Sequence, residues 1–146
     1  MMLAGTIVVG LCANIAIPAC THAQLRTRTM ANMANFVSVG NSAQDYYNQD
    51  REWPEDRGAG REPPELSQYL QGRVRWDQGD VRYDWRNWVR DDGRPKNNAK
   101  RSGVAVGFSV GTRDEKLLAM TENVWGNPLN KTYGWGVSFP IVVMVQ

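Results

Sequence analysis

Few residues of this chain could act as nucleophiles or general bases, and they are concentrated at its start. The single histidine, His22, and the two cysteines, Cys12 and Cys20, lie at the beginning of a 146-residue sequence. The first carboxylate, Asp45, is far from His22 along the chain. Cys12 and Cys20 are eight residues apart on a predicted helix, ~12 Å along its axis, which exceeds the ~7 Å limit for a disulfide. We therefore expect unpaired cysteines, no zinc finger and no enzymatic activity.

Oxygen ligands for a hard cation are also sparse. Calcium needs several carboxylate and carbonyl oxygens, whereas the loop 123–132 offers amide side chains and has only Glu122 beside it. Asp91 and Asp92 are the better oxygens, but they stand in a predicted turn where exposure to solvent is the favoured interpretation. We predict no cofactor, with calcium at Asp91 and Asp92 as the weaker alternative.

Basic and aromatic residues alternate between residues 73 and 101, which include nine basic and five acidic side chains. Cations interleaved with aromatic rings suit single-stranded nucleic acid. A nucleic-acid patch here would consist of Arg82, Arg86, Trp88 and Arg90. However, Tyr83 and Trp85 alternate onto the predicted core face, and Asp84 is placed to pair with a neighbouring arginine. The total net charge of +2 gives no further support, so nucleic acid is the alternative and ordinary strand packing is favoured.

The first 25 residues carry no charged side chain. As a helix, the apolar run from Leu3 to Cys20 would span ~27 Å, close to the ~30 Å core of a bilayer. A cleaved secretory signal would carry a basic n-region, which is missing, and a buried core helix would keep a polar stripe. We therefore favour a membrane anchor. The residues of this helix are Ile7, Val8, Val9, Gly10, Leu11, Asn14, Ile15, Ile17 and Pro18, and the family resemblance described below implies that the same residues serve in assembly.

The helix is predicted to continue to residue 53. Between Gln24 and Gln49 there is no proline and only one glycine. Apolar or small residues recur at spacings of three and four, which predicts one stripe facing a core. The stripe consists of Met30, Met33, Val37, Gly40, Ala43 and Tyr47.

The rest of the chain alternates between strands and short helices. Proline and glycine predict a surface loop over residues 53–64, followed by a helical turn at 65–70. Alternating apolar residues predict strands over 81–90, 102–111 and 132–145, with a helix at 112–123. Pro140 cannot donate to a ladder, so it indicates a sheet edge or a bulge. The predicted fold is α+β, with a long N-terminal helix on a small antiparallel sheet. Its parts are a transmembrane and assembly half of the helix (3–20), an amphipathic half (21–53) and a globular part (54–146).

Two segments resemble type IV pilin-like proteins, especially the pseudopilins of type II secretion. The run from Ile7 to Ala19, which ends in Ala-Ile-Pro-Ala, is similar to the apolar helix of that family. The segment from Tyr46 to Pro54 is similar to the tyrosine, polar run and aromatic-proline pattern at the end of its long helix. The resemblance covers about the first 55 residues. The leader and the Gly-Phe-Thr-Leu-x-Glu type processing motif are absent, so we expect a start placed too late, with the motif encoded upstream.

The resemblance implies a pilin-like fold and a structural role. The expected function is a subunit of a type IV pilus-like or type II secretion pseudopilus filament. The expected location is the inner membrane, with a single pass and the globular part in the periplasm or outside. Arg26 and Arg28 follow the apolar run and favour the opposite orientation, a conflict that a truncated start would resolve. The expected partners are membrane lipid, other pilin-like subunits and the assembly machinery. The alternatives are a soluble exported domain after signal cleavage and a pilin-like nucleic-acid-binding protein.

Overall fold

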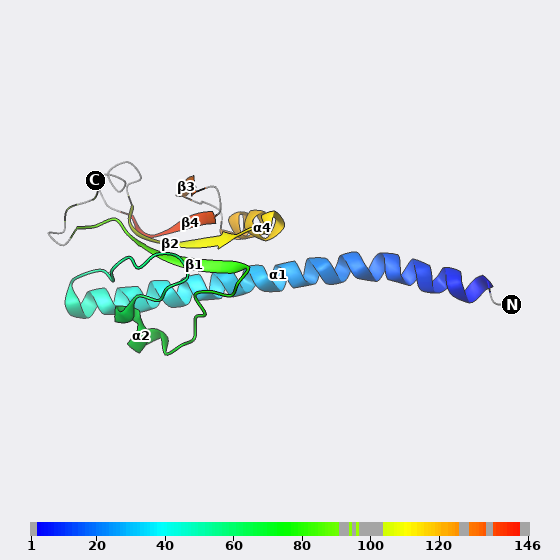
Figure 1. The fold of residues 1–146 in the computed structure, drawn as a ribbon, viewed down its shortest axis with the longest axis horizontal. Coiled ribbons are helices and arrows are strands. Elements are labelled where there is room, and N and C mark those ends of the chain that lie inside the picture. The colour runs from blue at the N-terminus through cyan, green and yellow to red at the C-terminus, as the bar shows by residue number, and fades with distance from the viewer. Residues whose placement is uncertain are drawn as a thin grey trace.

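A long helix lies along one face of a small antiparallel sheet (Figure 1). The computed structural model describes residues 3–90, 94, 96, 104–125, 129–133 and 136–143, with helical side chains described from Ala19 onward. The helices are α1 (Leu3–Asp50), α2 (Pro64–Leu70) and α4 (Glu115–Trp125). The strands are β1 (Val81–Asn87), β2 (Val104–Thr112), β3 (Leu129–Tyr133) and β4 (Gly136–Val143). The α+β class with a long N-terminal helix and an antiparallel sheet is confirmed.

Helix α1 is continuous over 48 residues, ~72 Å at ~1.5 Å per residue. Figure 1 shows that its second half runs beside the sheet, whereas its first half extends beyond the sheet toward the N-terminus. The helix ends where Arg51 adopts a left-handed backbone (φ 62°) and donates its amide to the Tyr47 carbonyl, 2.9 Å away. The Tyr47 ring then stacks on Trp53, with ring centroids 4.3 Å apart. The predicted end at residue 53 is therefore close to the observed one.

The face that α1 turns toward the core differs from the predicted stripe. Met30 and Val37 are 55% and 49% exposed, whereas Ala43 is buried as predicted. Met33, Gly40 and Tyr47 of the stripe are half-buried. Among the described side chains of α1, the buried ones are Thr29, Asn32, Phe36, Val39, Ser42 and Ala43. The stripe was wrong at Met30 and Val37 because one large ring and one amide decide the rotation of the helix. Phe36 packs edge-on against Phe108 of β2, and Asn32 bonds with Tyr83 of β1.

The strand order is β1-β2-β4-β3, with every neighbouring pair antiparallel. Alternation predicted four inward residues on each of the first two strands, and six of these eight are buried as predicted. They are Val81, Tyr83, Trp85, Val106, Phe108 and Val110. Val89 is half-buried beyond the end of β1, and the side chain of Val104 is outside the described set. The chain places large side chains on the face toward α1 and small ones on the other face of β2, as the alternation predicted.

The C-terminal part of the sheet differs from prediction. The single strand expected over 132–145 is two strands, because the chain reverses so that Tyr133 of β3 pairs with Gly136 of β4. Strand β4 lies between β2 and β3, so Pro140 is not at an edge. The pairing register shifts next to Gly107, which lies opposite Pro140. The bulge, which was one of the two predicted explanations for this proline, is therefore confirmed.

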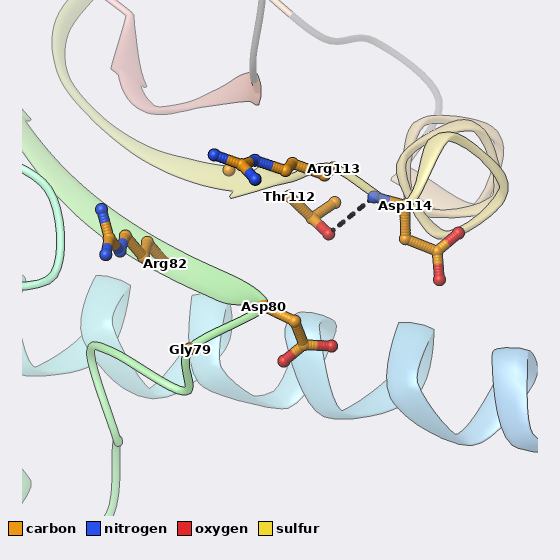
Figure 2. Close-up of a pocket in the computed structure, with 7 residues that line it drawn as sticks. Gly79, Asp80, Arg82, Thr112, Arg113 and Asp114 are labelled. Carbon is orange, nitrogen blue, oxygen red and sulfur yellow. Dashed lines mark hydrogen bonds between the residues drawn. The ribbon is translucent and has the colours of Figure 1, made fainter.

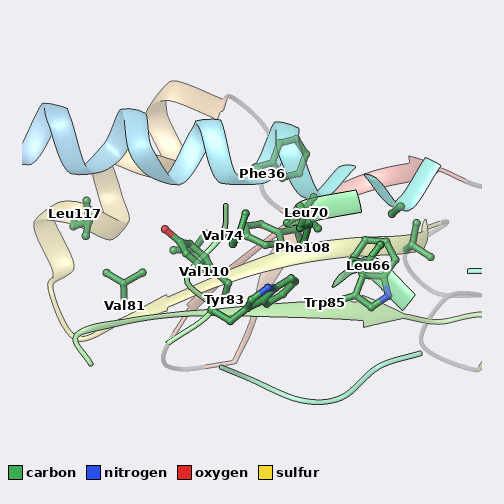
Figure 3. Packing of buried hydrophobic residues seen from close by; sticks show 14 residues of the cluster. Phe36, Leu66, Leu70, Val74, Val81, Tyr83, Trp85, Phe108, Val110 and Leu117 are labelled. Carbon is green, nitrogen blue, oxygen red and sulfur yellow. The ribbon is translucent and has the colours of Figure 1, made fainter. Parts of the chain in front are cut away.

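The core is built around one aromatic residue of β2. The fully buried Phe108 ring meets Phe36 of α1, Trp76 and Tyr83, with centroids 5.9, 6.0 and 5.1 Å away. Figure 3 shows the rings of Phe36, Phe108 and Tyr83 between the helix and the strands, with Leu66 and Leu70 of α2 nearby. Aromatic pairs in this range add stabilisation beyond their buried area. This cluster fixes how α1 lies on the sheet.

A polar network links three elements inside this core. The Tyr83 hydroxyl donates to Asn32 Oδ1 (2.7 Å) and accepts from Asn35 Nδ2 (2.9 Å). Asn32 Nδ2 in turn donates to Thr121 Oγ1 of α4, 3.3 Å away. Buried polar groups that keep their partners cost little, whereas an orphaned one carries its full desolvation penalty. The network therefore joins α1 to β1 through the Tyr83 hydroxyl and α1 to α4 through the Asn32 amide.

We expect Tyr83→Phe to lower the free energy of unfolding by about 1–3 kcal/mol, because it leaves the buried amide of Asn32 without its partner. Urea denaturation followed by circular dichroism measures the change. Tyr69→Phe is the matched control, since the Tyr69 hydroxyl bonds Gln49 at an exposed position and its loss should cost under about 0.5 kcal/mol. Equal stability of Tyr83→Phe and the unaltered protein would show that the network does not stabilise the fold.

Candidate functional site

The predicted membrane anchor is corrected by the structure. Within the part of the chain that the structure describes, no helix is both long and apolar enough to cross a bilayer. The described side chains of α1 begin at Ala19, and from Thr21 onward they are mainly polar or charged, including His22, Gln24 and Arg26. The prediction of a single-pass inner-membrane protein, with membrane lipid as a partner, is therefore not upheld. The backbone of Ile7 to Pro18 lies in α1 as expected, but the side chains of these residues are outside the described set.

The outward face of α1 carries a strip of small and apolar side chains without a charge. We call Ala23, Thr27, Met30, Ala34 and Val37 the exposed strip; each of them is exposed. Their spacing alternates between four and three residues, which is the spacing that brings side chains to one helix–helix seam. The Thr27 hydroxyl donates to the Ala23 carbonyl of the preceding turn (3.0 Å), so its polar group is satisfied within the helix. The strip is a surface suited to another helix.

Ion pairs of Arg28 connect the middle of α1 to the rest of the domain. The guanidinium of Arg28 forms ion pairs with Asp80, just before β1, and with Asp114, just before α4. Asp114 Oδ2 is 3.0 Å from Arg28, while its Oδ1 accepts the Leu117 amide and so caps α4. Arg28 thus joins α1 to the segments before β1 and α4. The part of α1 that precedes Arg28, which we call the bare part, extends beyond the sheet (Figure 1). In the sequence, Arg28 was noted only as one of two basic residues that follow the apolar run.

A groove of about 580 Å³ lies beside the ion pairs of Arg28. Figure 2 shows Arg82 and Arg113 on one side of it, with Asp80 and Asp114 on the other. Gly111 lies opposite Arg82 in the β1–β2 register and, because it has no side chain, leaves open space in the groove. The lining residues are Gly79, Asp80, Arg82, Gly111, Thr112, Arg113 and Asp114. Both aspartates pair with Arg28, whereas Arg113 has no ion-pair partner among the described residues, so the uncompensated charge facing the groove is positive.

The predicted nucleic-acid residues do not form a stacking surface. Arg82, Arg86, Trp88 and Arg90 follow one another along β1 and its extension, but they differ in exposure and partners. Arg82 is exposed and pairs with Asp77 (3.2 Å), whereas Arg86 is mostly buried and contacts Asp84 and Asp56. Trp88 is half-buried and Arg90 is exposed. The other aromatic residues of the segment, Trp76, Tyr83 and Trp85, are buried in the core.

Asp84 is buried although it alternates with the core residues Tyr83 and Trp85 along β1. It lies opposite Ser109 of β2, and its side chain is 1% exposed. Its Oδ2 is 2.6 Å from Arg86 Nη2. Burial raises the pKa of Asp84 to about 6, although the Arg86 charge lowers it and Asp56 raises it further. Loss of hydration thus outweighs the ion pair.

The remaining predicted sites are placed as follows. Asp91 and Asp92, the calcium candidates, lie outside the described residues. Among the residues that are described, no three His, Cys, Asp or Glu side chains are grouped to hold a metal ion. Cys20 and His22 are exposed on α1, and the side chain of Cys12 is outside the described set.

Comparison of the chain with models of protein families, with curated proteins and with solved structures gives no match.

The surface features missed in the sequence are the exposed strip and the arginine groove. A seam at spacings of four and three was visible in the residue types, but Met30 and Val37 were assigned to the core. The groove gave no local signal, because Arg82 and Arg113 are 31 residues apart and meet only through β1–β2 pairing.

Proposed function

We propose that this protein is a structural, non-enzymatic subunit of a pilin-like filament, of the type IV pilus or type II secretion pseudopilus kind. The supporting observation is the layout of α1. One uninterrupted helix packs its second half on the sheet and extends its first half past the domain (Figure 1). An enzyme or a small binding domain has no need of such an extension. A filament subunit needs it to contact its neighbours.

The composition of α1 supports assembly through this helix. The run from Leu3 to Ala19 has no charged residue, and burial of apolar surface is worth about 25 cal/mol per Å². The exposed strip continues at helix–helix spacing from Ala23 to Val37 on the outward side of the domain. Packing such helices side by side removes both surfaces from water. The resemblance of residues 7–19 and 46–54 to pilin-like proteins supports the same proposal.

The proposal is tested by self-association of the purified full chain, with negative-stain electron microscopy and analytical ultracentrifugation. We expect elongated assemblies, and we expect Val37→Glu to raise the concentration needed for assembly by tenfold or more, because it would bury an unpaired charge in a helix seam. Val124→Glu is the matched control, because Val124 is similarly exposed on α4 (53%) and lies away from the strip.

Two results would contradict the proposal. One is a full chain that remains monomeric at every concentration tested. The other is a mature protein in cells whose N-terminal sequence begins near Gln24, which would instead support an exported domain released from a signal segment. Equal effects of Val37→Glu and Val124→Glu would exclude the exposed strip as the contact surface.

A further inference from the structure

The two ends of the folded domain carry an excess of charge of opposite sign. At the C-terminal end of α1, residues 44–65 include seven acidic and three basic residues. Asp45, Asp50 and Glu52 are exposed there and have no ion-pair partner among the described residues. Negative charge at this end also acts on Tyr46. The pKa of its phenol is raised mainly by burial and then by the charges of Asp50, Glu65 and Glu52. This end therefore has an excess of negative charge.

The groove lies at the other end of the domain. Arg113 is exposed and has no ion-pair partner in the part of the chain that is described. Among the described residues, Arg82 pairs with Asp77, and both side chains are about half exposed (58% and 45%), so this pair contributes little and can be exchanged. Both arginines line the groove, Arg82 from β1 and Arg113 from just after β2 (Figure 2). Two neighbouring guanidinium groups favour carboxylates, which they can bind in a bidentate manner.

The lengths of the two parts of α1 would allow the acidic end of one copy to meet the groove of another. From Arg28, which marks the groove, to Asp50 the helix rises ~33 Å, and from Leu3 to Arg28 it rises ~38 Å. The bare part of α1 is therefore about as long as the part covered by the domain. A second copy in the same orientation, shifted by this length, would lie beside the bare helix with its acidic end against the groove.

We propose that Asp50 and Glu52 at the α1 end of one copy dock against Arg82 and Arg113 in the groove of the next copy. The two surfaces are different, so the contact is heterologous and repeats without closing, as a filament requires. This inference depends on the proposed function, because it requires copies that assemble. It adds which surfaces meet and in which direction the copies follow one another.

The test is a charge exchange in the full chain, followed by ultracentrifugation. We expect Arg113→Glu and Asp50→Arg each to raise the concentration for half-assembly about fivefold, as for one exposed ion pair turned repulsive. The combined variant should return to within about twofold of the unaltered protein, since the charges match again. Arg73→Glu, an equal change at an exposed site outside the groove, should have no effect. Arg113→Gln should show a smaller increase, which covers the case that the glutamate disturbs α4.

The salt dependence of assembly is a second, independent test of the docking proposal. Raising NaCl from about 0.05 to 0.5 M should weaken assembly of the unaltered protein more than that of Arg113→Gln, because screening acts on the contact that the variant lacks. If the unaltered chain assembles but the single reversals assemble equally well, or the combined variant is not restored, the docking proposal is wrong and the filament proposal stands. An unaltered chain that never assembles contradicts both.

Discussion

Replacing Phe108 by alanine is expected to lower the free energy of unfolding by about 3–5 kcal/mol, the range measured for aromatic residues removed from well-packed cores. Phe108 is fully buried, and its ring contacts Phe36, Trp76 and Tyr83. The substitution removes the apolar area of the ring and leaves a cavity between elements that the rigid α1 cannot close. Since domains are stable by about 5–15 kcal/mol in total, the loss is a large fraction of what holds the fold.

Urea denaturation of the full chain measures this effect, with near-ultraviolet circular dichroism reporting on the aromatic cluster. Val124→Ala on the surface of α4 is the control and should change stability by less than about 0.5 kcal/mol. A loss of less than about 1.5 kcal/mol in Phe108→Ala would show that the helix can settle onto the sheet. It would also remove the argument that this ring fixes the rotation of α1.

The elements of this fold could be predicted from local sequence, because their signals are local. The absence of proline between Gln24 and Gln49 favours one helix, and strict alternation identified the inward residues of β1 and β2. The rotation of α1 could not be predicted, since the apolar spacing of the helix fits two faces. The face through Phe36 and Val39 is buried, while the face through Met30 and Val37 remains outside. The choice depends on Phe108 and Tyr83, which are more than 40 residues away.

The same limit applies to the candidate site. Arg28 was visible as a charged residue on a helix, but its partners Asp80 and Asp114 lie 52 and 86 residues further along the chain. The groove depends on the Arg28 ion pairs and on the pairing of Arg82 with Gly111 in the β1–β2 register. Residue types gave the chemistry of each side chain, and only the strand order brings those side chains together. The membrane assignment was wrong because no helix in the described part of the chain is both long and apolar enough to cross a bilayer.

Asp84 provides the strongest expected pH dependence. Its folded pKa of about 6 lies above the ordinary value of 3.8, so between these values the folded protein holds more protons than the unfolded chain. The contribution of Asp84 to stability is therefore fully present below about pH 4 and is lost as the pH rises through about 6. At ~1.4 kcal/mol per pKa unit, the loss amounts to about 2–3 kcal/mol.

Asp84→Asn should remove this loss, because an amide has nearly the same shape and cannot ionise. The stability of the variant minus that of the unaltered protein should increase by about 2–3 kcal/mol between pH 4 and pH 7, measured by urea denaturation at both values. Arg86 retains Asp56, 3.8 Å away, which limits the cost of losing its buried partner. Asp80→Asn is the control, since Asp80 is exposed (64%) and should give no rise of this sign. A difference that stays flat or falls toward pH 7 would show that the attraction of Arg86 exceeds the cost of burying the carboxylate.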